Sequence, residues 1–323
     1  MKLIVLTLLL FGVVAPATAA PDQITAYRAL VAQDLRLATI GYRLASANAA
    51  YCQRRERNPG WAMHDEQQYP DRDVARAAFG LRTPIAVSAV VPGGPADRLG
   101  IKAGDGVIAL NDAVFNIRTD LRHKPSAERM EKIQKALREA MAANGAIRLT
   151  LETAEGQKQI TFEPPAICAS RFWVDARSKL DAGADGDGVR VTDGLMTFTA
   201  SDDAELAAVV AHELSHNLLG HRERLNAAKR RTSEILATEI EADRLSVWLM
   251  ANAGYDPNAA LRFADRYGRK TGLGIFSDGT HLRWKNRVKV MRGEIDLIQN
   301  AKKQNGLLPP PLLVGDELAT LGK

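Results

Sequence analysis

Two histidines four residues apart, with a glutamate beside the first, constrain this chain more than any other feature. The run His212-Glu213-Leu214-Ser215-His216 has the pattern HExxH. Residues four apart share one face of an α-helix, so a helix over this run lets both imidazoles reach a single Zn²⁺. Glu213 then lies beside the metal, where its carboxylate can accept a proton from a bound water. We therefore expect a helix that carries a catalytic zinc site.

The residues before this run also favour a helix. Asp202 and Glu205 have the spacing of a capping box at a helix start. The apolar residues that follow recur at helical spacing and would bury one face of the helix; they are Leu206, Val209, Val210 and Leu214. The helix is therefore predicted to begin near residue 203 and to be packed in a core.

A catalytic zinc ion needs a third protein ligand and keeps one position open. In one known arrangement the third ligand is a histidine six residues after the second, with a glycine between. Here those positions hold Leu219 and Arg222. His221 misses the position by one residue and points away from the metal-facing side of a helix. The sequence therefore excludes this arrangement.

In a second arrangement the third ligand is a glutamate from another helix. Glu239 and Glu241 are the two candidates, and they lie about 200° apart around a helix. Asp243 is four residues after Glu239 and shares its face. With Glu239 as the ligand, Asp243 can hold a zinc-bound histidine by its other ring nitrogen. We therefore predict that Glu239 binds the metal.

The composition of the chain is that of an ordinary globular protein. The chain has 323 residues, which suggests two or three domains. A net charge of only +5, with no long Lys/Arg run, argues against a nucleic-acid partner. Residues 1–20 combine Lys2, an apolar stretch and a run of small residues, the layout of a secretory signal peptide. We therefore expect a periplasmic or otherwise exported protein that is soluble after the signal peptide is removed.

The rest of the chain divides into blocks, and together they predict an α+β fold. Residues 21–82 are expected to form a long helix to about Arg57 and an irregular segment, packed on the domain that carries the HExxH run. Residues 83–165 carry several short β-type runs and one amphipathic helix near residues 126–143. Residues 166–305 are mostly helical in pattern, and residues 306–323 form a loosely held tail.

The β-rich block contains a string that resembles the PDZ domains of bacterial exported proteases. The string runs from Val91 to Asp105 and includes Pro92-Gly93-Gly94-Pro95-Ala96. The resemblance implies a module that binds an extended peptide at a sheet edge. We therefore expect a PDZ-like domain inserted into a mostly helical metallopeptidase domain.

The helical block resembles the zinc endopeptidases of the CAAX prenyl protease, HtpX and BepA group, whose zinc ligands are those of gluzincins. The resemblance rests on HExxH, then Glu239-Ile240-Glu241-Ala242-Asp243-Arg244, then Ala253-Gly254-Tyr255-Asp256-Pro257. It implies that His212, His216 and Glu239 bind one Zn²⁺. Glu213 would then act as the general base, and Asp243 would support a ligand.

The same resemblance implies further roles around the metal. Residues Gly188–Thr192 would form the edge strand on which the substrate lies. His281 would be a transition-state donor or a reversible fourth ligand. Tyr255 and Arg287 are the other candidates for stabilising the oxyanion. The membrane-spanning helices of some relatives have no counterpart here, so the chain is more similar to the soluble periplasmic members.

Cys52 and Cys168 bracket the PDZ-like block. An inserted domain leaves and rejoins its host at nearby points, because domain termini usually lie close together. Export to an oxidising compartment would allow the two thiols to pair. We therefore predict a Cys52–Cys168 disulfide.

These observations support two hypotheses. The first is an exported zinc endopeptidase that hydrolyses envelope or misfolded proteins, with the PDZ-like module presenting or gating the substrate. The second is a non-catalytic adaptor with a structural or vestigial zinc site. Glu213 favours the first, because an adaptor does not need a carboxylate there. The expected partners are protein or peptide substrates, a peptide ligand of the PDZ-like module, and membrane or envelope complexes at the periphery.

Overall fold

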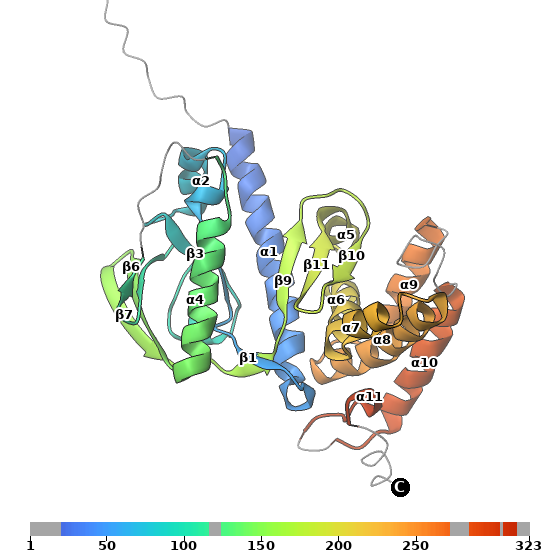
Figure 1. The fold of residues 1–323 in the computed structure, drawn as a ribbon. Coiled ribbons are helices and arrows are strands. Elements are labelled where there is room, and N and C mark those ends of the chain that lie inside the picture. The colour runs from blue at the N-terminus through green and yellow to red at the C-terminus, as the bar shows by residue number, and fades with distance from the viewer. Residues whose placement is uncertain (1–20, 116–123, 272–283, 304–305, 315–323) are drawn as a thin grey trace, which may run out of the picture.

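The computed structural model describes residues 21–115, 124–271, 284–303 and 306–314, which form two lobes on either side of a long first helix (Figure 1). This helix, α1, spans Pro21–Ala47. It contacts α2 and β3 in one lobe, and α6 and β9 in the other. Leu37, Ile40 and Leu44 recur at three- and four-residue spacing on α1 and are buried in the core of the helical lobe.

The first lobe is built on a sheet with the strand order β2-β3-β4-β6-β7, and the short β5 pairs with β4. Helix α4 covers this sheet and buries Met130, Ile133, Leu137 and Met141 against it. The strands are β2 (Trp61–Asp65), β3 (Ile85–Val90), β4 (Gly106–Leu110), β5 (Ala113–Val114), β6 (Ile147–Thr153) and β7 (Gly156–Phe162). The helices are α2 (Arg72–Phe79), α3 (Pro95–Arg98) and α4 (Glu128–Asn144).

The N-terminal segment differs from the prediction. Helix α1 ends at Ala47, ten residues earlier than expected, and is followed by a 3-10 turn η1 (Ala49–Tyr51) and strand β1 (Arg55–Arg57). The cause is Asn48, whose buried amide donates to the carbonyls of Leu44 and Leu249 and ties the helix end to a distant part of the chain. The helix therefore stops where a long-range contact holds it.

The segment from residue 58 to 82 was expected to be irregular, and this prediction is wrong. It contains β2, the 3-10 turn η2 (Glu66–Gln68) and α2. Strand β2 pairs antiparallel with β3, so it belongs to the sheet of the first lobe. A domain boundary at residue 83 would therefore separate two paired strands.

The predicted disulfide is present. Cys52 and Cys168 are bonded with their Cα atoms 5.4 Å apart, across 116 residues of chain. Strand β1 pairs antiparallel with β8 (Ala166–Cys168) beside the bond, and both cysteines are buried with Ala45 and Ile167. The segments that enter and leave the first lobe, β1 and β8, are thus paired with each other and joined by the disulfide.

The second lobe is mostly helical and contains a three-stranded sheet with the order β10-β11-β9. Its largest contacts are between α6 and α8, which pack against each other in the main core. The strands are β9 (Arg171–Asp175), β10 (Ala182–Ala184) and β11 (Gly188–Thr192). The helices are α5 (Asp193–Phe198), α6 (Asp203–Leu218), α7 (His221–Ala227), α8 (Thr232–Asn252), α9 (Asn258–Thr271), α10 (Trp284–Asn300) and α11 (Pro311–Val314).

The observed architecture confirms an α+β fold. The tail was expected to be loosely held, but Leu308 is buried, and its backbone exchanges two hydrogen bonds with the side chain of Asn252. Among the described helices, none combines the length and the apolar character needed to cross a membrane. Residues 1–20, with the expected signal peptide, lie outside the described part of the chain.

Candidate metal centre

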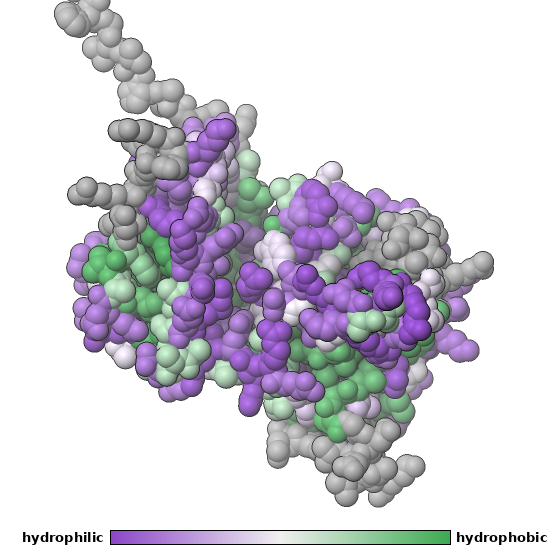
Figure 2. Space-filling view, in the orientation of Figure 1, coloured by the Kyte–Doolittle hydropathy of each residue, from purple (hydrophilic) through white to green (hydrophobic). Residues whose placement is uncertain are grey.

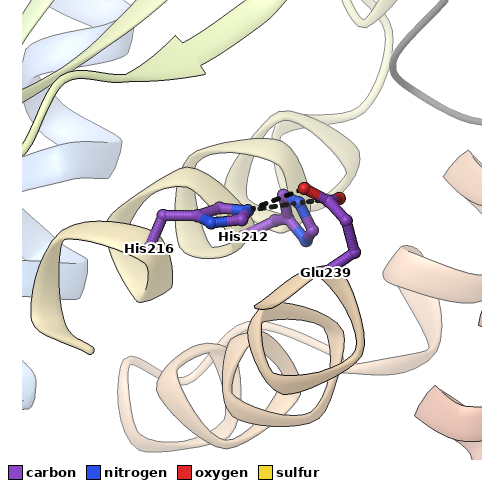
Figure 3. A group of neighbouring side chains, drawn as sticks. All are labelled: His212, His216 and Glu239. Atoms are coloured by element: carbon purple, nitrogen blue, oxygen red, sulfur yellow. Dashed lines mark hydrogen bonds and ion pairs between the residues drawn. The ribbon is translucent and has the colours of Figure 1, made fainter. Parts of the chain in front are cut away.

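Three potential ligand atoms meet between α6 and α8 (Figure 3). The Nε2 atoms of His212 and His216 lie 3.2 Å apart. Glu239 on α8 faces both, with 3.4 Å from Oε2 to His212 Nε2 and 3.5 Å from Oε1 to His216 Nε2. The three residues predicted to bind zinc are therefore adjacent.

These separations are those that a tetrahedral zinc ion imposes. Bonds of about 2.0–2.1 Å place neighbouring ligand atoms of a tetrahedron about 3.3–3.4 Å apart. The three observed separations of 3.2, 3.4 and 3.5 Å agree with this value. Two imidazole nitrogens and one carboxylate are also a usual ligand set of a catalytic zinc. The residues present fit Zn²⁺.

Helix α6 is capped where the sequence predicted. The carboxylate of Asp202 accepts hydrogen bonds from the backbone N–H groups of Ala204 and Glu205. Glu205 does not return a bond to complete a capping box; its carboxylate pairs with Arg266 on α9. The cap and the ion pair together hold the start of the helix that carries both histidines.

The ring nitrogen of His212 that faces away from the ligand group is held by a carboxylate, which is itself held by an arginine. His212 Nδ1 lies 3.1 Å from Asp243 Oδ1, and Arg287 on α10 donates to both oxygens of Asp243. Burial would raise the pKa of Asp243, but the guanidinium and the hydrogen bonds hold that pKa well below its usual range. Asp243 therefore stays ionised and can fix the ring of His212.

Arg287 was predicted to be one of the oxyanion donors. The structure places its guanidinium on Asp243, and its Nη2 is 3.2 Å from His212 Nδ1, the ring nitrogen that does not face Glu239. Arg287 is only 2% exposed. Arg287 therefore supports Asp243, and its oxyanion role stays a prediction.

Glu213 lies beside the ligand group and is not part of it. Its side chain is buried, and its Oε1 has no hydrogen-bond partner among the described residues. Burial raises the pKa of Glu213 to about 7. A carboxylate with this pKa can accept and release a proton near neutral pH, as a general base must.

The edge strand of the small sheet is not the one that was predicted. Strand β11 (Gly188–Thr192) lies in the middle, because it pairs with β10 on one side and with β9 on the other. The two edges are β10 and β9, and β9 packs against α1. Asn217, the residue after His216, accepts from the backbone of Gly186 and donates to the carbonyl of Gly188, so α6 holds the turn between β10 and β11.

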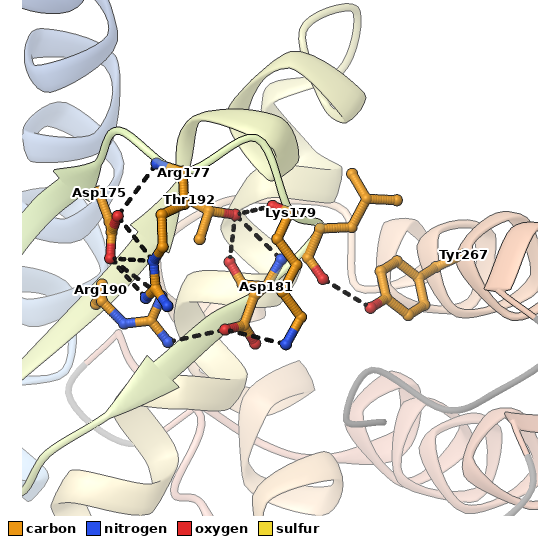
Figure 4. A network of polar contacts seen from close by, with 8 residues as sticks. Asp175, Arg177, Lys179, Asp181, Arg190, Thr192 and Tyr267 are labelled. Atoms are coloured by element: carbon orange, nitrogen blue, oxygen red, sulfur yellow. Dashed lines mark hydrogen bonds and ion pairs between the residues drawn. The ribbon is translucent and has the colours of Figure 1, made fainter. Parts of the chain in front are cut away.

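A polar network fixes the start of β10 (Figure 4). Arg190 Nη2 lies 3.1 Å from Asp181 Oδ2, and the hydroxyl of Tyr267 donates to the carbonyl of Leu180 at 3.0 Å. The hydroxyl of Thr192 accepts from the backbone N–H of Asp181. These contacts from β11 and α9 hold the outer strand in one position.

Tyr255 is the other described residue that was predicted as an oxyanion donor. Tyr255 stacks under the guanidinium of Arg43 on α1, with 4.4 Å from Cζ to the ring centre. This contact places Tyr255 between α1 and the end of α8, and its oxyanion role stays a prediction. His281 lies outside the described residues.

His221 is a residue whose place the sequence interpretation missed. His221 does not continue α6 but begins α7, and its Nδ1 lies 2.9 Å from Nδ1 of His216. Gly220 lies between α6 and α7 and adopts a left-handed φ of 63°, which changes the direction of the chain before His221. A glycine at that point could have indicated that His221 does not continue the helix.

The comparisons with known proteins agree with this centre. Residues 170–238 match the sequence profile of Peptidase family M48. The match includes His212, Glu213 and His216 and ends one residue before Glu239. No curated protein sequence matches this chain. The chain is thus similar to Peptidase family M48 over the stretch that carries both histidines, and the three neighbouring side chains could hold a metal ion.

Proposed function

We propose that this protein is an exported zinc-dependent endopeptidase. The observation that carries the proposal is the meeting of His212, His216 and Glu239 at zinc-ligand separations, with the buried Glu213 carboxylate beside them. An adaptor with a structural zinc has no need of a buried carboxylate beside the ligand group. The geometry therefore favours hydrolysis over simple binding.

When bound, zinc supplies a Lewis acid that lowers the pKa of a water molecule and polarises the carbonyl of the scissile bond. Glu213 accepts a proton from the attacking water and donates it to the nitrogen of the departing amine. Asp243 and Arg287 keep the ring of His212 in place during these steps. Peptide-bond cleavage thus needs no covalent attachment of substrate to the chain.

We propose that the substrate lies along β10. It is an edge strand, and no strand pairs with its other side in the described part of the chain, whereas the other edge strand, β9, packs against α1. Its residues Ala182, Gly183 and Ala184 are small, which allows the backbone of an extended peptide to approach closely. Cleavage within an extended segment would make the enzyme an endopeptidase that prefers unfolded regions.

Two features support action outside the cytoplasm. The Cys52–Cys168 bond is suited to an oxidising compartment, and residues 1–20 have the composition of a secretory signal peptide. We therefore place the protein in the periplasm or another exported location, with misfolded or envelope proteins as its substrates.

We propose that the first lobe is a PDZ-like module that presents or gates these substrates. Its edge strand β2 and helix α4 border a cleft of about 350 Å³, which is lined on a third side by α1. Trp61 and Met63 from β2, and Leu137 and Met141 from α4, contribute apolar surface to it. An extended peptide that pairs with β2 would therefore be held next to the helix that connects both lobes.

The decisive experiment compares the wild type with Glu213→Gln on an unfolded protein substrate. The variant should bind one zinc per chain and keep its fold, because Glu213 is not a ligand, and it should lose most of its hydrolysis. Metal analysis and circular dichroism serve as controls. Equal proteolysis by the two purified proteins would refute the mechanism. An inactive wild type that still bound peptides would instead support the adaptor hypothesis.

A further inference from the structure

A line of polar side chains runs from the ligand group to the protein surface through His221. The Nδ1 atoms of His216 and His221 are 2.9 Å apart, and His221 Nε2 is 3.0 Å from Glu241 Oε2. Arg224 Nη1 donates to both oxygens of Glu241, at 2.8 and 2.9 Å. His221 is only 1% exposed, so its ring nitrogens bond to these side chains and not to solvent.

When His216 binds the metal, the contacts of its two ring nitrogens determine which nitrogen carries the proton in His216 and in His221. Its Nε2 faces His212 and Glu239, and a ligating nitrogen must offer a lone pair. The proton of His216 is then on Nδ1 and is donated to Nδ1 of His221. His221 consequently carries its proton on Nε2 and donates it to Glu241.

The two histidine ligands are thus supported in different ways. His212 contacts the carboxylate of Asp243 directly, and Arg287 holds that carboxylate. Among the described residues, no carboxylate is found within bonding distance of His216 Nδ1, and the nearest one in line is Glu241, reached through His221.

We propose that His221 and Glu241 form a positioning relay that holds His216 in the Nδ1-protonated tautomer and thereby increases the affinity for zinc. The proposal rests on the zinc-dependent function proposed above and assigns two residues to it that are not ligands. A histidine that donates its second nitrogen to an acid keeps its ring orientation and is a stronger base toward the metal.

The outer end of the relay can be altered without opening the core. The side chains of Glu241 and Arg224 are 28% and 40% exposed, whereas His221 is buried. Figure 2 shows that the surface over α7 is hydrophilic. Substitution of Glu241 is therefore a milder change than substitution of His221, and it interrupts the same line of contacts.

Helix α8 offers a closely matched control. Glu234 also pairs with Arg224, at 3.0 Å, and its side chain is 26% exposed. Both glutamates lie on the same helix, but only Glu241 contacts His221. Glu234→Ala and Glu241→Ala therefore each remove a carboxylate from Arg224, and only Glu241→Ala interrupts the relay. Glu234 also lies 3.9 Å from Arg231, in a pair whose arginine is mostly exposed.

The test measures zinc affinity by competition with a chelator for wild type, Glu241→Ala and Glu234→Ala. We expect Glu241→Ala to bind Zn²⁺ about 10- to 100-fold more weakly, and Glu234→Ala to stay within about twofold of wild type. Equal affinities for all three proteins, or equal losses in the two variants, would overturn the relay. A wild type that binds no zinc would instead refute the proposed function.

A second measurement does not depend on zinc. The ¹⁵N chemical shifts of His216 in the metal-free protein report which ring nitrogen carries the proton. We expect the Nδ1-protonated form to predominate in wild type and in Glu234→Ala, and to lose population in Glu241→Ala. The same tautomer population in wild type and Glu241→Ala would overturn the proposal even if zinc affinity changed for another reason.

Discussion

Glu239 and Glu241 are two residues apart on α8, yet they contact different histidines. Glu239 faces Nε2 of His212 and of His216, while Glu241 contacts His221 on α7. The angle of about 200° between them on a helix separates a ligand from a residue that supports one. Two neighbouring acids of the same type therefore have different expected effects on the metal.

Glu239→Ala should abolish stoichiometric zinc binding, because it removes one of three protein ligands. Metal analysis after dialysis would measure this as a loss from about one zinc per chain to well below half. Glu213→Gln is the control, since it alters a neighbouring buried acid that is not a ligand. Full zinc occupancy in Glu239→Ala would show that another acid completes the site.

Arg287→Met should destabilise the protein strongly. The substitution leaves the Asp243 carboxylate buried without the guanidinium that holds it, and breaking such a pair costs about 3–5 kcal/mol. Denaturant unfolding would measure the change in the free energy of unfolding. Arg54→Met removes an ion pair with Asp187 that is mostly exposed, and it should cost less than about 1 kcal/mol. Similar losses in both variants would contradict this account.

The parts of the site that follow from local spacing were predictable from the sequence. His212 and His216 share a helix face, and Asp243 shares one with Glu239; helical geometry alone brings each pair together. The strands near residues 85–90, 106–110 and 147–153 also lie where their β-branched runs indicated.

The features that were missed depend on contacts between distant residues. Helix α1 ends at Asn48 because Asn48 bonds to Leu249, which is 201 positions away. Strand β2 owes its structure to pairing with β3, and β11 is central because β9 pairs with it in parallel. The role of His221 depends on the left-handed turn at Gly220. None of these contacts leaves a periodic pattern in the chain.

Asp34 on α1 should make stability depend on pH. Burial raises the pKa of Asp34 to about 6, although a hydrogen bond from the backbone of Val174 opposes the shift. The folded protein therefore keeps this proton at a pH where the unfolded chain has lost it. The free energy of unfolding should fall as pH rises from about 4 to about 6, and the loss should persist at pH 7.

Asp34→Asn removes this titration. At pH 7 the variant should be about 2 kcal/mol more stable than wild type, and at pH 4 the two should be nearly equal. Denaturant unfolding at both pH values measures the difference, so that other groups titrating in both proteins cancel. A variant that is equally stable or less stable than wild type at pH 7 would show that ionising Asp34 does not destabilise the folded protein.

The disulfide should contribute most of its stabilisation by restricting the unfolded chain. Cys52 and Cys168 are 116 positions apart in the sequence, and closing a loop of this length stabilises by about 4–5 kcal/mol in the chain-entropy model. The double variant Cys52→Ala/Cys168→Ala should therefore unfold at a clearly lower denaturant concentration than wild type. Reduction of the wild type should lower its midpoint to a similar degree, whereas the reductant should leave the double variant unchanged.

Peptide mapping without reductant should recover the two cysteines in one linked fragment. Two free thiols in protein made in an oxidising compartment would refute the connection, and with it the account of how one lobe is inserted into the other.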